Sequence, residues 1–389
     1  MFHPPSYINR SHANELCLPP APIMSSPKKN MQYVRLGNSG LKVSRVILGT
    51  MSYGSPEWQK WVLDEEEGIK HIKLAYVWFI LSPASYLKYP RYEMGIQTFD
   101  TANAYSNGLS EVVLGKAIKQ LNLPRDEIVV MTKVSVYFQV GHRINEFTMG
   151  GGGPPNEHGL SRKHIFDSIK RSLERLQLDY VDVLQCHRFD YNTPIAETMQ
   201  ALHDVVKAGY ARYIGMSSCY AYQFQAMQNY AITNNLTPFI SMQNHYNLLY
   251  REEEREMMPT LKIDLGKMFG VGSIPWSPLA RGFLTRPLDQ QQTTRGQTDR
   301  LIGRYGKAHE GNSEIVRRVE SLAKKKNLTM AQVALAWVMS KDQVSAPIVG
   351  TTNIKHLEEL IAAVSVKLDD EEIKHLEEPY APQAIFGHS

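Results

Sequence analysis

The sequence predicts a single (β/α)8 barrel, a TIM-barrel fold of the α/β class, preceded by a disordered extension. Short β-branched or apolar runs alternate with segments of helical period, which is typical of parallel strands joined by crossover helices. We count eight such runs, and eight parallel strands are enough to close a barrel. The chain has 389 residues, 43% of them hydrophobic, so it is long enough for this fold with insertions.

The expected strands are short and lie at Val46–Leu48, Thr98–Phe99, Ile128–Thr132, Val181–Leu184, Tyr213–Gly215, Phe239–Met242, Gly272–Pro275 and Pro347–Val349. Helical patterns fill the intervals, for example Arg162–Leu176 and Met330–Ser340. Ser161 and Thr329 are expected N-caps, and Gly209 is expected to end the helix before it. An open doubly wound sheet is the alternative fold, but no G-x-G-x-x-G turn follows an early strand.

Two kinds of segment are expected to lie outside this regular pattern. Residues 1–30 are rich in Pro, Ser and Asn without periodicity, so we predict a disordered extension, with the barrel over residues 31–389. Two insertions, Val77–Tyr92 and Ile263–Met268, fall in helix-to-strand connections. The first is either a docking element with an exposed Trp78 or a translated intron, and its lack of pattern favours the intron. Residues 1–23 could similarly come from an extended gene model rather than belong to the fold.

Composition narrows the expected partners and compartment. The net charge of +4 and the absence of a long Lys/Arg run argue against nucleic-acid binding. The apolar run Val77–Leu81 is far shorter than the roughly 20 residues that span a bilayer, so no membrane partner is expected. Three cysteines without a C-x-x-C spacing suit a reducing compartment. We therefore expect a cytoplasmic monomer or weak homo-oligomer that acts on a small molecule.

The active site of such a barrel lies at the C-terminal ends of its strands. An acid, a phenol, an ammonium and an imidazole follow or end these runs at Asp100, Tyr105, Lys133 and His187, and we call these four the tetrad. Singly, the acid could cap a turn, the lysine could be a solvated cation and the histidine a structural hydrogen-bonder. Together on one rim, they indicate proton chemistry.

Seven short motifs in the correct order resemble those of the aldo-keto reductases. Asp100-x4-Tyr105, Met131-Thr132-Lys133 and Leu184–Arg188 resemble the family's catalytic motifs. The other four are Ile214–Ser218, Met242–Asn244, Ile274–Leu279 and Val349–Thr352. The resemblance covers Tyr33 to the C-terminus and is strongest to the fungal aryl-alcohol dehydrogenase-like branch. It implies NADP(H)-dependent reduction of an aldehyde or ketone, with an aromatic substrate expected.

The resemblance also implies the roles of the tetrad. Tyr105 would be the general acid in reduction and the base in oxidation, Lys133 would be held by Asp100, and His187 would orient the substrate oxygen. The charge logic agrees, because hydride delivered to a carbonyl carbon leaves negative charge on the oxygen. A free tyrosine titrates near pH 10, and a cation beside it favours the phenolate.

Cofactor contacts follow from the same resemblance. Ser217, Ser218 and Gln243 would hold the nicotinamide carboxamide, and Trp276 would stack on the ring. The phosphates would lie on two segments where barrels and helix N-termini bind them: Ser277, Leu279 and Arg281, and then Gly350, Thr351, Lys355 and His356. The family often has Arg at the position of His356. NAD therefore remains an alternative to NADP, with Lys355 as a substitute cation.

Two other functions have less support in the sequence than carbonyl reduction. A metal-dependent hydrolase would need clustered ligands, whereas His158, His164 and His203 lie in loops or helices and His245 stands alone after its strand. A nucleotide-binding regulatory subunit of the same fold would need a partner-binding N-terminal segment, and residues 1–30 have no amphipathic pattern.

The aromatic residues Phe138, Phe147, Tyr220 and Phe283 either build an aromatic-accepting pocket or are ordinary loop packing.

Overall fold

Eight parallel strands form one sheet in the order β10-β3-β4-β5-β6-β7-β8-β9. The computed structural model describes residues 31–77, 95–135, 156–262, 269–299, 301–308 and 310–388. The strands are β3 (Ile47–Gly49), β4 (Thr98–Asp100), β5 (Val129–Val134), β6 (Val181–Cys186), β7 (Ala211–Ser217), β8 (Phe239–Gln243), β9 (Gly272–Ser273) and β10 (Ile348–Val349).

The two end strands of this sheet are joined, so the sheet closes into a barrel. The Ile348 N–H donates to the Pro275 carbonyl at 2.8 Å, and the Ser345 N–H donates to the Ser273 carbonyl at 2.8 Å. The predicted (β/α)8 barrel is therefore confirmed. Strand β9 is shorter than the predicted Gly272–Pro275, although the Ile274 N–H still donates to the Met242 carbonyl at 2.9 Å.

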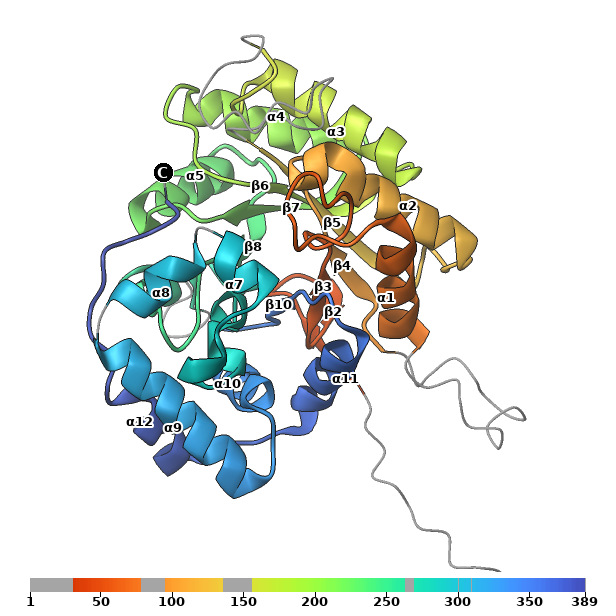
Figure 1. Ribbon diagram of the computed structural model, residues 1–389. Helices are drawn as coiled ribbons and strands as arrows, with labels where there is room; N and C mark the ends of the chain where they lie inside the picture. Colours follow the sequence, from red (N-terminus) through yellow and green to blue (C-terminus); the bar gives the residue numbers. More distant parts are fainter. Residues whose placement is uncertain are drawn as a thin grey trace, which may run out of the picture.

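Helices surround the strands (Figure 1). Ser161 and Thr329 cap α3 and α10, where their hydroxyls accept from the backbone N–H of His164 and Gln332, so both predicted N-caps are confirmed. Gly209 follows α4 with φ of +83°. The α-helices are α1 (Glu65–Val77), α2 (Leu109–Gln120), α3 (Arg162–Leu176), α4 (Ile195–Lys207), α5 (Ala221–Thr233), α6 (Met257–Leu261), α7 (Thr294–Thr298), α8 (Ile302–Ala308), α9 (Glu310–Lys326), α10 (Met330–Met339), α11 (Ile354–Ala362) and α12 (Asp370–Glu377). The 3-10 turns are η1 (Tyr105–Gly108), η2 (Glu252–Glu254), η3 (Ala280–Thr285), η4 (Leu288–Gln290) and η5 (Ala363–Ser365).

A hairpin closes the N-terminal end of the barrel. Strands β1 (Tyr33–Arg35) and β2 (Lys42–Ser44) pair antiparallel, and Leu36 packs with Met131 and Val183 in one apolar cluster. Gly37, at φ of +59°, lies so near β9 that a Cβ would come within 2.5 Å of the Gly270 carbonyl oxygen. Since side chains alternate along a strand, Lys133 shares the inner face of β5 with Met131 but lies nearer the C-terminal end. The barrel thus has an apolar floor beneath a polar upper layer.

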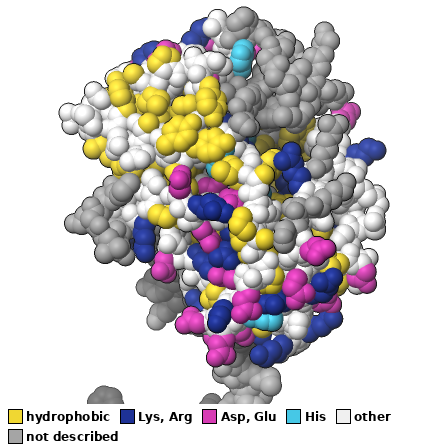
Figure 2. Space-filling view, turned by 90° about the vertical axis from the view of Figure 1, so that its left-hand side faces the viewer, with side chains coloured by type: hydrophobic (Ala, Val, Ile, Leu, Met, Phe, Trp, Pro, Cys, Tyr) yellow, Lys and Arg dark blue, Asp and Glu magenta, His cyan; other side chains and the backbone are white. Residues whose placement is uncertain are grey.

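One face of the molecule is divided by side-chain type. Figure 2 shows hydrophobic side chains gathered over the upper part of one face and charged side chains over the lower part. On the charged part, α9 and α12 are linked by Lys326 to Glu372 at 2.8 Å, and Arg318 pairs with Glu378 at 2.9 Å. Within the described ranges, no helix has the length and apolar character needed to cross a membrane.

The flanks of the first predicted insertion are hydrogen-bonded to each other. Residues 78–94 and 263–268 lie outside the described residues, as does the predicted extension 1–30. The Ile96 N–H donates to the Ala75 carbonyl at 2.8 Å, and the Gly95 N–H donates to the Tyr76 carbonyl at 3.4 Å. The end of α1 and the approach to β4 therefore meet directly, at the barrel end opposite the strands' C-termini.

Deletion of Val77–Tyr92 should leave the barrel folded and its expected NADPH-dependent aldehyde reduction intact. The flanking residues already meet, and loop-closure cost changes by only about 0.6 kcal/mol per doubling of length. Circular dichroism, thermal unfolding and specific activity of the deletion variant and the full chain test this expectation. A deletion variant that folds but is inactive would show instead that the segment is functional.

Candidate active site

A buried lysine connects the acid and the phenol at the C-terminal end of the barrel. Asp100 ends β4, Lys133 lies on β5, and Tyr105 begins η1. The Lys133 Nζ donates to Asp100 Oδ2 at 2.6 Å, to Tyr105 Oη at 3.1 Å and to the Thr101 carbonyl at 2.8 Å. An ammonium has three donors, so all of them are used in a side chain that is 0% exposed.

These contacts keep the buried lysine charged. Burial by itself favours the neutral amine, but the Asp100 carboxylate and then the Tyr105 hydroxyl outweigh it and raise the pKa of Lys133 above its ordinary value. Removing one partner of a buried pair leaves an uncompensated charge. Asp100, itself buried, is therefore the anion that makes a cation stable inside the barrel.

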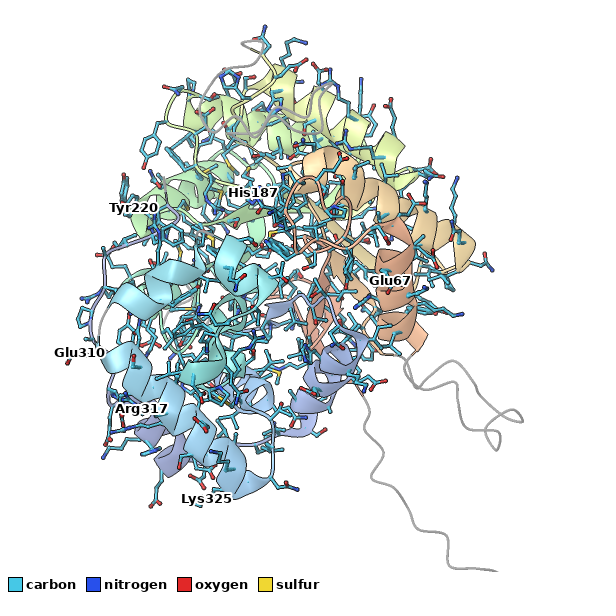
Figure 3. The ribbon with its side chains drawn as sticks, viewed as in Figure 1. Glu67, His187, Tyr220, Glu310, Arg317 and Lys325 are labelled. Atoms are coloured by element: carbon cyan, nitrogen blue, oxygen red, sulfur yellow. The ribbon has the colours of Figure 1, made fainter. Side chains whose placement is uncertain are left out.

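His187 follows β6 and faces Tyr105 across the site. The two rings lie 5.8 Å apart at an interplanar angle of 84°, and Figure 3 shows His187 toward the centre of the molecule. Burial, with smaller effects from the charges of Arg188 and Lys133, holds the pKa of His187 well below 6.5. The imidazole is therefore neutral, so it can donate one hydrogen bond and accept another.

A cavity of about 880 Å³ opens over these groups. Asp100, Tyr105 and His187 line it, whereas Lys133 lies beneath them. Of the predicted cofactor positions, those on the wall are Ser217, Gln243, Trp276, Ser277, Leu279, Arg281, Gly350, Thr351 and His356. Ser218 and Lys355 are not on the wall: the Ser218 hydroxyl accepts from Trp276 Nε1 at 2.9 Å, and Lys355 is exposed at the start of α11.

Trp276 is held by a stack of rings that the sequence did not reveal. His245 lies between Tyr250 and Trp276, with ring centroids 4.2 Å away on both sides and interplanar angles of 13° and 12°. Its Nε2 is 2.7 Å from the Tyr305 hydroxyl. Burial, followed by the charge of Arg281, holds the pKa of His245 well below 6.5. The histidine that stood alone in the sequence is thus part of the support of the indole ring.

The cavity wall carries more cations than anions. Arg281 and Arg295 share the Asp299 carboxylate, at 2.7 and 3.1 Å, and within the described part of the chain no carboxylate pairs with Arg286. Burial, and then the charge of Arg281, lowers the pKa of Arg295 to about 10, so it remains charged at neutral pH. The positively charged lining residues are Lys60, Arg188, Arg281, Arg286 and Arg295, and the acidic ones are Asp100 and Glu359. The wall therefore favours an anionic ligand.

The aromatic lining differs from the four residues considered in the sequence. Phe138 and Phe147 lie outside the described residues, while Phe283 belongs to a buried core cluster and Tyr220 is absent from the wall. The aromatic residues that line the cavity beside Tyr105 and Trp276 are Trp61 and Phe386. The guanidinium of Arg295 lies 4.1 Å from the Trp61 ring centroid, so this wall is both aromatic and cationic.

Comparison with known proteins identifies the family of this chain. The model of the Aldo/keto reductase family matches residues 45–381. The chain belongs to this family. A versiconal hemiacetal acetate reductase of Aspergillus parasiticus is 49% identical over 91% of this chain and 98% of its own. A Schizosaccharomyces pombe protein provisionally named as an aryl-alcohol dehydrogenase is 46% identical over 91% of this chain and 97% of its own.

Membership of the aldo/keto reductases confirms the resemblance seen in the seven motifs. An aldo-keto reductase of Fusarium vanettenii, 44% identical over 94% of this chain and 95% of its own, adds to the same group of fungal relatives. The chain is therefore an oxidoreductase of a family that reduces small-molecule carbonyl compounds with a nicotinamide cofactor. Across the described residues, no group of three or more His, Cys, Asp or Glu side chains is placed to hold a metal ion.

The buried imidazoles of His187 and His245 predict that stability falls at acid pH. The pKa values of His187 and His245 lie well below 6.5 in the folded state, whereas an unfolded chain titrates near about 6.5. Below that pH the unfolded state binds protons that the folded state excludes. As the pH falls below about 6.5, the free energy of unfolding should therefore decrease by up to about 1.4 kcal/mol per pH unit for each histidine. Above about pH 6.5 both states are neutral at these histidines, and the full stability is retained.

Urea unfolding of the wild type and His187→Gln at neutral and mildly acid pH measures this effect. His187→Gln should reduce the loss of stability on acidification, because an amide does not titrate. The same replacement at the exposed His375 of α12 is the matched control. Equal pH dependence in the wild type and H187Q would contradict the assignment of a neutral buried His187.

Proposed function

We propose that this protein is an NADP(H)-dependent reductase of aldehydes or ketones in which Tyr105 is the general acid. One observation carries the proposal: a fully buried Lys133 bridges Asp100 and Tyr105 at the edge of a large cavity. A buried cation at a phenolic oxygen has a clear chemical use, because it stabilises the phenolate left when the proton departs. The aromatic lining by Trp61, Trp276 and Phe386 supports an aromatic carbonyl substrate.

The direction of the Tyr105 proton follows from its hydrogen bond. Lys133 donates to the Tyr105 oxygen, so the hydroxyl proton of Tyr105 is free to point elsewhere, and the side chain lines the cavity. A substrate carbonyl oxygen placed between Tyr105 and the neutral His187 would accept a hydrogen bond from each. Tyr105 then protonates the oxygen as negative charge develops on it, and Lys133 compensates the resulting phenolate.

The residues present fit a phosphorylated dinucleotide. The bound cofactor supplies the hydride. Trp276 offers an indole face fixed by His245, while Ser217 and Gln243 offer polar groups to the carboxamide. Ala280 and Arg281 have φ of +48° and +57°, a strained conformation for non-glycine residues that is enriched at ligand-binding sites. This turn and the start of α11 are where we place the phosphates.

The surplus positive charge on the wall favours NADP over NAD. NADP carries one more phosphate than NAD, and the cationic residues Arg286 and Arg295 add to the predicted Arg281 and His356. We further propose that residues 31–389 form one catalytic domain, which acts in the cytoplasm as a monomer or weak homo-oligomer. Binding of NADPH without turnover would instead favour a nucleotide-binding regulatory subunit.

Tyr105→Phe should abolish most turnover and leave nucleotide binding close to that of the wild type, because it removes the proton and little else. Lys133→Met should be comparably damaging. The measurements are NADPH oxidation with a panel of aromatic aldehydes and nucleotide titration of each variant. The mechanism is wrong if Tyr105→Phe turns over at the wild-type rate.

NADPH should bind at least about tenfold more tightly than NADH, because a charge-assisted phosphate contact contributes about 1.5–3 kcal/mol. Arg286→Gln should weaken NADPH binding by about tenfold for the same reason. Arg317→Gln is the control, since Arg317 lies on α9, well away from His187 in Figure 3. Fluorescence titration that gives NADH equal or higher affinity would contradict the cofactor assignment.

A further inference from the structure

Gln185 is a buried polar residue to which neither the sequence motifs nor the catalytic scheme gives a role. It lies on β6 opposite Lys133 of β5 and Gly215 of β7, and its side chain is 0% exposed. A Cβ at Gly215 would lie 3.2 Å from the Gln185 Cγ. The absence of a side chain at Gly215 thus gives Gln185 room to reach across the barrel.

Gln185 completes a hydrogen-bonded triangle with Asp100 and Gln243. The Gln185 Nε2 donates to Asp100 Oδ1 at 3.0 Å. The Gln243 Nε2 donates to the same Asp100 oxygen at 3.0 Å and to Gln185 Oε1 at 3.0 Å. Since Asp100 Oδ2 accepts from Lys133, the triangle and the catalytic lysine share one carboxylate.

Counting donors fixes the orientation of the Gln243 amide. Its NH2 group has two hydrogens, and these are directed to Asp100 and Gln185. If the Gln243 amide were rotated by 180°, its oxygen would face Asp100 Oδ1 and Gln185 Oε1, which are both acceptors. The Oε1 is therefore on the side away from the triangle, and Gln243 lines the cavity. A carbonyl oxygen there matches the NH2 donor of a nicotinamide carboxamide.

We propose that Gln185 is a positioning residue for the cofactor, which orients the Gln243 amide so that its oxygen receives the nicotinamide carboxamide. The proposal rests on the function proposed above. Asp100 alone would hold Gln243 by a single hydrogen bond, about which the amide can turn. With Gln185 present, both hydrogens are fixed before the cofactor arrives, so binding does not need to order this group.

The test compares two ligands that share the adenosine and its 2′-phosphate. Calorimetric titration with NADPH and with adenosine 2′,5′-bisphosphate is carried out on the wild type, Gln185→Leu, Gln243→Leu and the double variant. Gln185→Leu should weaken NADPH by about tenfold, as expected when a buried polar contact is lost, and leave the bisphosphate unchanged. In the Gln243→Leu background, Gln185→Leu should have no further effect on NADPH, because it acts through Gln243.

Gln228→Leu is the matched control. Gln228 is a buried glutamine on α5 whose amide donates to the Phe239 carbonyl at 3.0 Å and accepts from the Phe239 N–H at 2.9 Å. Its replacement should lower thermal stability and leave the ratio of the two ligand affinities unchanged. If Q185L does not fold, Gln185→Met, which has a similar length and no amide, replaces it in the comparison.

Three results would overturn the role of Gln185: unchanged NADPH affinity in the variant, an equal loss for both ligands, or additive losses in the double variant. A wild-type protein that binds no NADPH would instead contradict the proposed function itself. The two failures are therefore distinguishable in the same titration series.

Discussion

The charge of Lys133 is the constraint on which the site depends. An ammonium enclosed in a barrel is stable only if an anion lies beside it and all its donors are used, and Asp100, Tyr105 and the Thr101 carbonyl satisfy both conditions. Asp100 in turn accepts from Gln185 and Gln243. The polar layer is therefore one connected network, and a change to any member alters the electrostatics of the others.

The fold supplies the positions of these groups. Parallel strands bring residues far apart in the chain to one end of the barrel, while the apolar floor and the β1–β2 hairpin occupy the other. Segments outside the strands position further side chains around the rim. Turn η1 brings Tyr105 back over Lys133, and α8 contributes Tyr305, which contacts His245. Strands β4 and β5 thus position Asp100 and Lys133, whereas η1 positions Tyr105 and the loops shape the cavity.

Much of the barrel could be predicted from the sequence because the positions of its helices and strands depend on local signals. Helix α3 occupies Arg162–Leu176 as predicted, since Ser161 caps its start and the apolar period continues to its end. The four tetrad residues could be expected on one rim because each lies at or just after the end of a strand, where the barrel topology brings residues together.

Contacts between distant, non-periodic residues could not be predicted in this way. Gln185 is 85 residues from Asp100, and Tyr305 is 60 residues from His245. Arg286 follows η3 and Arg295 lies in the short helix α7, and neither segment has a sequence pattern that indicates which way its side chains point. Ser218 and Lys355 were placed by motif position alone, and their orientation away from the cavity wall depends on local packing and exposure.

The sharing of Asp299 by Arg281 and Arg295 has a kinetic consequence. One carboxylate cannot neutralise two guanidiniums, so the cleft has a positive potential before any ligand arrives. Such a field draws a polyanion inward and accelerates encounter, and this long-range attraction weakens as ionic strength rises, since the Debye length is about 8 Å at physiological salt. Once the ligand is enclosed, the contacts are shorter than that length and are screened far less. Salt should therefore slow the capture of nucleotide much more than it speeds its escape.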